Sequence, residues 1–419
     1  MKILPCLLNG MVNAIPSKSQ AHRALICAAL ADRQTRVECA SQSKDITATA
    51  ACLSALGASM TLERDCYTVQ PLKPDDKNTA SLPCGESGST FRFLLPIAGA
   101  LGKKASFLLE GRLPERPLSP LYEELVRHGL ILSPQGANPF TAEGKLIPGS
   151  YLLDAGVSSQ FISGLLFALP LLNADSELRL TGKTESFPYV ELTMLMLEKF
   201  GIKIELNGMV FSIPGNQKYI SPGALGIEGD WSNAAFWLTA GVLSESGVTC
   251  EGLDLQSRQG DAAVLEILSR FGAQIKKSGG SVTVSGGKLR GIEIDAGNIP
   301  DLVPVLAAAA SAAEGITVIR NAGRLRLKES DRLSAISSVL NELGADVRVT
   351  EDGLIIKGKE RLSGGQVSSW GDHRIAMSAA IAASFCAEPV VILGAEAVNK
   401  SYPGFYNDLK LLGGNYTIC

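Results

Sequence analysis

The chain has little excess charge, few histidines and no long apolar run. Its 39 basic and 42 acidic residues leave a net charge of −3, which excludes the broad basic surface of a general nucleic-acid-binding protein. The longest apolar stretches, Phe161–Leu172 and Leu302–Ala313, reach about 12 residues, short of the ~18 that span a bilayer. Pro5 interrupts the first residues, which lack the layout of a signal or transit peptide. We expect no nucleic-acid partner and no membrane partner.

Cysteine pairs with metal-site spacing are also missing. The nine cysteines are scattered without a Cys-x-x-Cys, and the three histidines are too few for a His-rich site. This distribution predicts reduced thiols in a cytoplasmic protein and no metal. Hydrophobic residues make up 46% of the 419, which indicates a folded chain, and at ~100–200 residues per domain the length fits two to four domains.

Glycine is abundant, at 43 residues, and part of it follows a period. An amphipathic helical stretch, a glycine and a short β-like run recur six times, at intervals of 72, 72, 71, 72 and 69 residues. The recurring glycines are Gly57, Gly129, Gly201, Gly272, Gly344 and Gly413. Each stands where a helix end needs a left-handed backbone. The spacing predicts six copies of one unit.

A second pattern lies out of phase with the first. Apolar segments rich in small residues begin near Lys18, Gly88, Ser158, Trp231, Pro300 and Asp372. They are apolar nearly all round, so we expect buried helices whose polar first residues act as N-caps. Six copies group as three plus three, which predicts two similar α/β domains with a cleft between them.

The starts of these buried helices carry the candidate chemistry. Helix N-termini favour anions, and added Lys and Arg would turn them into phosphate or carboxylate sites. The residues concerned are Lys18, Ser19 and Arg23; Gly88, Ser89 and Arg92; Ser158, Ser159 and Gln160; Asp301; and Asp372, His373 and Arg374. For each serine alone, a simple N-cap remains the alternative.

Two further segments add charge. Glu115–Pro117 enters the second amphipathic helix, and Lys328–Arg332 enters the fifth. Glu329 lies between Lys328 and Arg332, which can tune a carboxyl group for proton transfer. An ordinary charged helix start remains the alternative.

Taken together, the motifs resemble the 5-enolpyruvylshikimate-3-phosphate synthase family from end to end. They are PSKSQAHRALICAALA, GESGSTFR, LPERPL, VSSQF, ESFPYVEL, IPD, KESDR, WGDHRIAM and NKSYPGF, in the family's order. The resemblance implies an α/β (α+β) fold of two domains, each of three βαβαββ repeats with buried parallel helices. It places one domain at 17–228 and the other at 1–16 and 229–419, with the chain crossing twice between them.

The resemblance also implies the reaction. The family transfers the enolpyruvyl group of phosphoenolpyruvate to the 5-hydroxyl of shikimate 3-phosphate and releases phosphate, on the route to chorismate and the aromatic amino acids. It implies no cofactor and a monomer. Asp301 would accept the hydroxyl proton, while Glu329 with Lys18 would protonate the methylene carbon, giving an adduct that eliminates phosphate.

Binding residues follow by motif. The shikimate 3-phosphate ligands would be Lys18, Ser19, Arg23, Ser158, Ser159, Gln160, Ser186, Tyr189, Asp301 and Lys328. The phosphoenolpyruvate ligands would be Lys18, Gly88, Arg116, Gln160, Arg332, His373, Arg374 and Lys400.

Three positions in and beside the glycine-rich second motif depart from the family pattern. Glu86 stands where Asn is usual, and Ser89 and Phe93 also differ, which leaves sensitivity to the family inhibitor glyphosate open. Two other functions stay in view. Enolpyruvyl transfer to UDP-N-acetylglucosamine would want a reactive cysteine in Gly111–Pro117, and none is there. A non-catalytic anion-binding repeat protein could share the scaffold.

Overall fold

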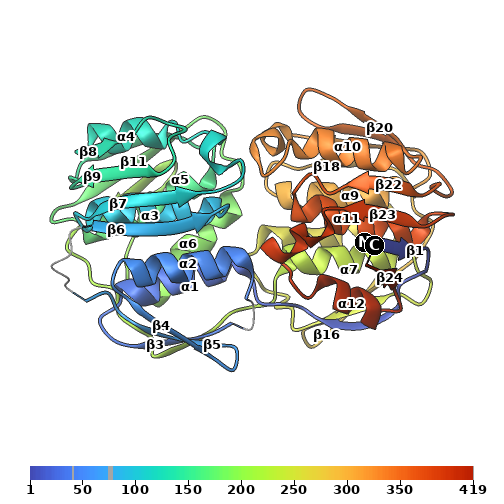
Figure 1. Cartoon of the computed structure of the whole chain (residues 1–419), viewed down its shortest axis with the longest axis horizontal. Coiled ribbons are helices and arrows are strands. Elements are labelled where there is room, and N and C mark those ends of the chain that lie inside the picture. The colour runs from blue at the N-terminus through green and yellow to red at the C-terminus, as the bar shows by residue number, and fades with distance from the viewer. Residues whose placement is uncertain (40–41, 74–78, 419) are drawn as a thin grey trace. The chain divides into compact units, whose positions relative to one another are not determined.

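The computed structural model describes residues 1–39, 42–73 and 79–418, and the chain divides into two compact units (Figure 1). We call Pro16–Ile227 the insert unit, and Met1–Ile15 with Glu228–Cys419 the terminal unit. Within the described residues the strands form six four-stranded sheets, three in each unit. This confirms the predicted α/β class and its six repeats.

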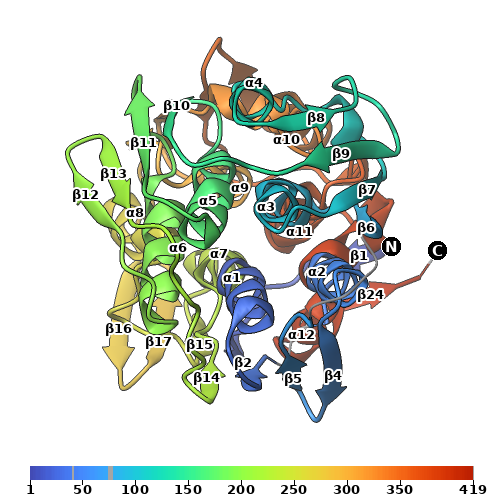
Figure 2. The same ribbon diagram turned by 90° about the vertical axis from the view of Figure 1, so that its left-hand side faces the viewer.

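The insert unit wraps three sheets around its helices (Figure 2). Its helices are α1 (Lys18–Leu30), α2 (Lys44–Ala55), α3 (Gly88–Ala100), α4 (Leu121–Arg127), α5 (Ser159–Ala168) and α6 (Phe187–Lys199). In spatial order its sheets are β14 (Ala224–Gly226), β3 (Thr35–Glu38), β5 (Cys66–Gln70), β4 (Ser59–Glu63); β6 (Thr79–Gly85), β7 (Lys104–Leu109), β9 (Phe140–Gly144), β8 (Leu130–Leu132); and β10 (Ser150–Asp154), β11 (Ser176–Thr181), β13 (Val210–Ile213), β12 (Glu205–Asn207). Short 3-10 turns lie at η1 (Leu113–Glu115) and η2 (Leu169–Leu171).

The terminal unit repeats this plan. Its helices are α7 (Trp231–Val242), α8 (Val264–Phe271), α9 (Val303–Ala310), α10 (Arg332–Glu342), α11 (His373–Ala382) and α12 (Phe405–Leu411). Its sheets are β16 (Gln274–Ser278), β17 (Ser281–Ser285), β15 (Val248–Glu251), β2 (Gly10–Asn13); β18 (Glu293–Asp295), β19 (Ile316–Arg320), β21 (Leu354–Lys357), β20 (Asp346–Val349); and β22 (Gly365–Ser368), β23 (Val390–Leu393), β1 (Lys2–Leu4), β24 (Asn415–Thr417). Its 3-10 turns are η3 (Gly260–Ala263), η4 (Pro300–Leu302), η5 (Gly323–Leu327), η6 (Ala383–Phe385) and η7 (Ala395–Lys400).

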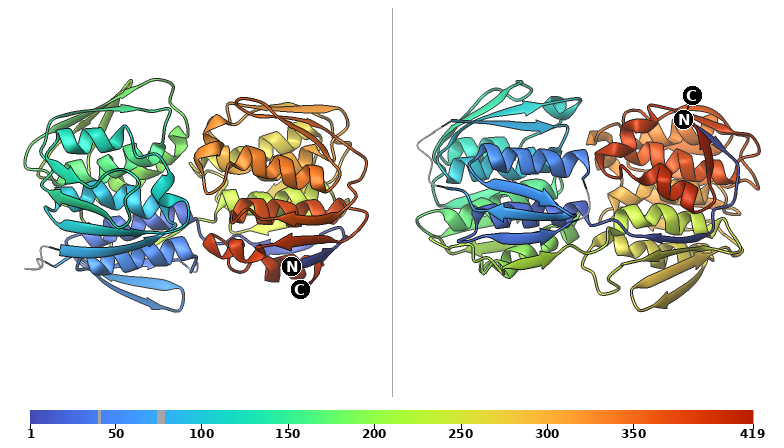
Figure 3. Two further views of the ribbon diagram at one scale, coloured as in Figure 1. Left: turned by 45° about the horizontal axis from the view of Figure 1, so that its top comes forward. Right: turned by 60° about the horizontal axis from the view of Figure 1, so that its bottom comes forward.

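Each sheet has one parallel strand pair and two antiparallel pairs. In four sheets a buried helix connects the parallel strands, as in β6–α3–β7, which is the crossover that a parallel pair requires. The other two exchange partners: β2 precedes α1 but pairs with β15, and β14 precedes α7 but pairs with β3. The N-terminal strand β1 lies between β23 and β24, so the two chain ends lie side by side (Figure 3).

Both predicted helix features are present. All twelve residues of α7 are buried, and α1, α3, α5, α9 and α11 are also mostly buried. The recurring glycines all have positive φ, between 76° and 113°. At the end of α8, Gly272 has φ 107° and the amide of Ala273 donates to the carbonyl of Leu268 at 3.0 Å, a helix termination that favours glycine.

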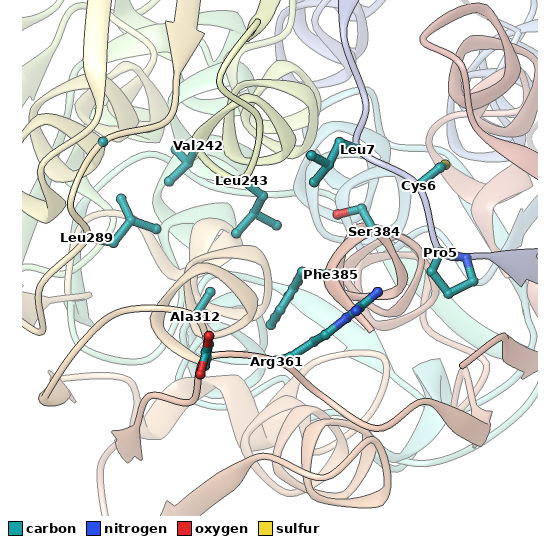
Figure 4. A pocket seen from close by; sticks show the side chains of 12 residues that line it. Pro5, Cys6, Leu7, Val242, Leu243, Leu289, Ala312, Arg361, Ser384 and Phe385 are labelled. Carbon is teal, nitrogen blue, oxygen red and sulfur yellow. The ribbon is translucent and has the colours of Figure 1, made fainter. Parts of the chain in front are cut away.

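A pocket of about 490 Å³ lies within the terminal unit, at the C-terminal ends of α7, α9 and α11 (Figure 4). Leu7, Leu243, Leu289 and Phe385 line it together with Arg361. None of the predicted site residues belongs to its lining. The candidate chemistry lies at the opposite ends of the same helices.

Candidate functional site

In the insert unit, the start of α1 carries a lysine that is held by an acid. Ser17 caps the helix by accepting from the amide of Gln20. The ammonium of Lys18 contacts Oδ2 of Asp45, at the start of α2, at 2.8 Å. Both side chains are largely buried, so Asp45 holds the ammonium of Lys18 at the start of α1.

Arg23 braces α1 against α6. Its Nε donates to Oγ1 of Thr193 at 2.8 Å, and Nη2 donates to the carbonyl of Tyr189 at 2.7 Å. Nη1 donates to the carbonyl of Ser19, and the guanidinium lies over the ring of Phe93. Burial lowers the pKa of Arg23 to about 10, so it stays charged at neutral pH. The contacts give this predicted ligand a structural role inside the unit.

The starts of α3 and α5 are joined by side-chain hydrogen bonds. Nε2 of Gln160 donates to Oγ of Ser89 at 2.9 Å. Arg92 donates from Nη1 to Oε1 of Gln160 at 2.7 Å and from Nη2 to the carbonyl of Pro117 at 3.1 Å. The predicted residues of these two helices are therefore brought together, and Arg92 orients Gln160.

The serines of the third repeat occupy two helix starts. Ser158 caps α5 and accepts from the amide of Gln160 at 3.3 Å, and Ser159 is the first residue of that helix. Ser186 precedes α6 with φ 52°, a left-handed conformation that is strained for a serine. The amide of Tyr189 donates to the carbonyl of Ser186 at 3.1 Å. Strain at Ser186 marks this turn as a functional candidate.

In the terminal unit, Arg332 joins three carboxylates. It is the first residue of α10 and is 2% exposed. Nη1 contacts Asp301 at 2.9 Å, Nη2 contacts Glu329 at 2.8 Å and Nε contacts Asp372 at 2.8 Å. The two predicted acid–base carboxylates therefore share one guanidinium. Lys328 precedes α10, so Lys328 and Arg332 do not lie on one face of the same helix.

The sequence predicted Asp301 at a capped helix start. In the structure it lies in η4, just before α9. Its Oδ2 accepts from Nη2 of Arg374 at 2.8 Å. Burial by itself would raise the pKa of Asp301. The positive charges of Arg374 and Arg332, with a smaller contribution from Lys328, outweigh burial and hold that pKa far below its usual range. Asp301 is thus a carboxylate at neutral pH.

Asp372 anchors both arginines. Its side chain caps α11 by accepting from the amide of Arg374 at 2.9 Å, in addition to its contact with Arg332. Arg374 also donates to Oγ of Ser232, and this hydroxyl in turn donates to Oδ1 of Asp230, the N-cap of α7. His373, 1% exposed, lies beside Asp372, with 3.7 Å between Nδ1 and Oδ1. Lys400 is buried at the end of η7.

Three supporting residues received no role from the sequence: Asp45, Thr193 and Ser232. Asp372 was predicted at a capped helix start, and the structure adds its contact with Arg332. Asp45, Thr193 and Ser232 carry no local signal, since the site residues that they contact, Lys18, Arg23 and Arg374, lie at least 27 positions away.

The paired charges predict an acid sensitivity. Burial would raise the pKa of Asp372, but Arg332 outweighs it, so the pKa values of Asp301 and Asp372 are both lowered. A lowered pKa adds stability above the unfolded value of about 4, and this stability is lost as the pH falls below it. We expect the urea midpoint to fall steeply below about pH 4. In Asp301→Asn this decline should be shallower. Equal pH slopes for the two proteins would contradict it.

Within the residues that the structure describes, no group of three or more His, Cys, Asp or Glu could hold a metal ion. No helix in residues 1–39, 42–73 and 79–418 has the length and apolarity to span a membrane. The eight described cysteines are free thiols.

Comparison with known proteins places this geometry in a family. A family model described as EPSP synthase (3-phosphoshikimate 1-carboxyvinyltransferase) matches residues 5–409. The 3-phosphoshikimate 1-carboxyvinyltransferases of Clostridium kluyveri and Clostridium acetobutylicum are 46% and 45% identical to this chain, over 99% of it and 97% of each relative. An EPSP synthase structure from Acinetobacter baumannii has 27% sequence identity and a TM-score of 0.81, covering 98% of this chain and 97% of that one. The chain therefore belongs to the EPSP synthase family.

Proposed function

We propose that this chain transfers the enolpyruvyl group of phosphoenolpyruvate to the 5-hydroxyl of shikimate 3-phosphate, releasing phosphate. The observation that carries the proposal is the sharing of Arg332 by Asp301 and Glu329. One guanidinium fixes the spacing of two carboxylates, as a proton acceptor and a proton donor acting on the same substrate pair would need. The identity of the two substrates is inferred from the family to which the chain belongs.

We assign shikimate 3-phosphate mainly to the insert unit. The assignment uses the starts of α1, α5 and α6, where Lys18, the serines of α5 and Ser186 offer a positive charge, hydroxyl groups and helix N-termini. Phosphoenolpyruvate is assigned to Gly88, Arg116 and Gln160 of the insert unit and to Arg332, Arg374, His373 and Lys400 of the terminal unit. Buried guanidinium groups suit a substrate with both a phosphate and a carboxylate.

The chemistry proceeds by addition and elimination. The 5-hydroxyl oxygen bonds to C2 of phosphoenolpyruvate as Asp301 takes the hydroxyl proton, and Glu329 with Lys18 delivers a proton to C3. The adduct then returns a proton from C3 to Glu329 with Lys18 as its C2–O bond to phosphate breaks, and the proton held by Asp301 leaves with the phosphate. Phosphoenolpyruvate would compete with Asp301 for Arg332 and Arg374. Losing that positive charge raises the pKa of Asp301, so substrate binding makes it a stronger base.

Phosphate release tests the function. Purified protein with both substrates should release phosphate, and omission of shikimate 3-phosphate should abolish the release. UDP-N-acetylglucosamine in its place should give none. Release with the nucleotide sugar would overturn the proposed acceptor, and no release with either acceptor would favour a non-catalytic anion-binding protein.

Replacing Arg374 with lysine tests the phosphoenolpyruvate assignment. Lysine keeps the charge but loses the forked contact, so KM for phosphoenolpyruvate should rise about tenfold or more, the loss of one charge-assisted hydrogen bond. KM for shikimate 3-phosphate should change less than about twofold. Initial rates with each substrate varied measure both constants, and Arg320→Lys, an exposed position, is the control. Equal changes for the two substrates would contradict the assignment.

A further inference from the structure

In the insert unit, the segment after β6 and the segment after β7 each place a charged side chain against a glycine of the other. Gly88 starts α3 after β6, and Gly111 follows the parallel neighbour β7. A Cβ at Gly88 would lie 2.9 Å from Nη1 of Arg116, so the guanidinium lies directly on this backbone. A Cβ at Gly111 would overlap Oε1 of Glu86. Each segment thus covers the glycine of the other with one charged group.

Both glycines are needed for this arrangement. Gly111 has φ 54°, a left-handed backbone that disfavours side chains, and the carboxyl of Glu86 occupies the space where a side chain would begin. The backbone also ties the segments together, because the amide of Glu110 donates to the carbonyl of Gly85 at 2.8 Å. The carboxylate of Glu86, an exposed residue, therefore lies against the backbone of Gly111 at this junction.

The arrangement places opposite charges at one helix start. Arg116 lies on the first residue of α3, and Glu86 stands two positions before it, separated by the N-cap Ser87. Gly88 and Arg116 are the insert-unit groups that we assign to phosphoenolpyruvate. A carboxylate at this junction attracts the guanidinium and repels an incoming anion.

We propose that Glu86 is a specificity-determining residue that acts as an internal counter-charge to Arg116 and weakens the binding of phosphoenolpyruvate. The inference rests on the proposed assignment of Arg116 to that substrate. The anion must bind a guanidinium that lies on the first residue of α3, two positions after Glu86 in the chain. Glu86 therefore sets the affinity for phosphoenolpyruvate without taking part in the chemistry.

Glu86→Gln keeps the size of the side chain and removes its charge. We expect KM for phosphoenolpyruvate to fall about two- to fivefold, the size of one exposed charge interaction, with kcat and KM for shikimate 3-phosphate within error of the parent. The inhibition constant of inorganic phosphate should fall by a similar factor. The change should shrink as salt is raised. Glu86→Asp, which keeps the charge, should stay near the parent.

A matched control removes a charge elsewhere on the same sheet. Glu143, exposed on β9, pairs with Lys104, and Glu143→Gln should leave both KM values unchanged. An unchanged or higher KM for phosphoenolpyruvate in Glu86→Gln would overturn the proposal. So would the same change in Glu86→Asp or Glu143→Gln.

A double-mutant cycle with Arg116→Ala separates the two assignments. Arg116→Ala alone should raise KM for phosphoenolpyruvate, and adding Glu86→Gln should then have little further effect. If Arg116→Ala leaves KM unchanged, the assignment of Arg116 is wrong, whatever Glu86 does. If Glu86→Gln lowers KM equally with and without Arg116, Glu86 does not act through Arg116 and the proposal is wrong.

Discussion

Arg332→Ala should lower the free energy of unfolding by about 3–5 kcal/mol, because it leaves the buried carboxylate of Asp372 without its arginine partner. Three acids contact this guanidinium, and one of them, Asp372, has no exposed surface. Activity should fall by at least about 100-fold, because Asp301 and Glu329 lose the group that fixes both. Urea unfolding and phosphate release measure the two effects.

Arg332→Lys and Arg320→Ala complete this experiment. Lysine keeps the charge but cannot contact three carboxylates in a fixed plane, so it should recover part of the stability and little of the activity. Arg320 pairs with Glu293 at the surface, and its loss should cost less than about 1 kcal/mol. A cost for Arg332→Ala as small as that for Arg320→Ala would contradict the central place of Arg332.

Asp301→Asn should reduce kcat by about 10²- to 10⁴-fold, the range for loss of a general base. The amide has nearly the shape of the carboxylate but cannot accept the hydroxyl proton. Its NH2 group would also face Nη2 of Arg374, where Oδ2 now accepts at 2.8 Å. KM for shikimate 3-phosphate should change far less than kcat. Steady-state phosphate release over a range of substrate concentrations separates the two constants.

Glu266→Gln is a suitable control for Asp301→Asn. Glu266 is exposed on α8, so losing its charge should leave kcat unchanged. Thermal unfolding of both variants checks that each is folded. A kcat for Asp301→Asn within about threefold of the parent would exclude Asp301 as the base.

The repeat architecture could be predicted because its signals are local. A glycine at a helix end needs only its own backbone conformation, and Gly57 and Gly344, 287 positions apart, both have positive φ. The buried helices were equally visible, because segments such as Trp231–Val242 are apolar on every face.

Strand exchange could not be predicted in the same way. Short segments such as Gly10–Asn13 and Ala224–Gly226 carry no mark of their partner, and each pairs with a strand about 190 or more positions away. Pairing depends on backbone hydrogen bonds that any residue except proline can make. Local sequence therefore placed the repeats but not these two pairings.

For the candidate site, the sequence predicted the charged residues better than their contacts. Lys328 and Arg332 suggested a cationic patch around Glu329, and the structure places Arg332 against that carboxylate. That Arg332 also contacts Asp301 and Asp372 depends on how α9, α10 and α11 pack, which no single segment encodes. Arg23 shows the reverse: its position suggested a ligand, but its partners lie mostly on α6.

The exchange of β2 and β14 sets an order for the growing polypeptide. Residues 16–227 form one continuous compact unit, so they can fold as soon as they leave the ribosome. The first fifteen residues cannot, because β2 needs β15, which follows the insert unit, and β1 needs β23 and β24, which are made last. The chain leaves the terminal unit after Ile15 and returns to it at Glu228. A hydrogen bond joins these two places, because the amide of Asp230 donates to the carbonyl of Ile15 at 2.7 Å. Strand β1 can therefore pair only after β23 and β24 have been synthesised, and the terminal unit is complete only then.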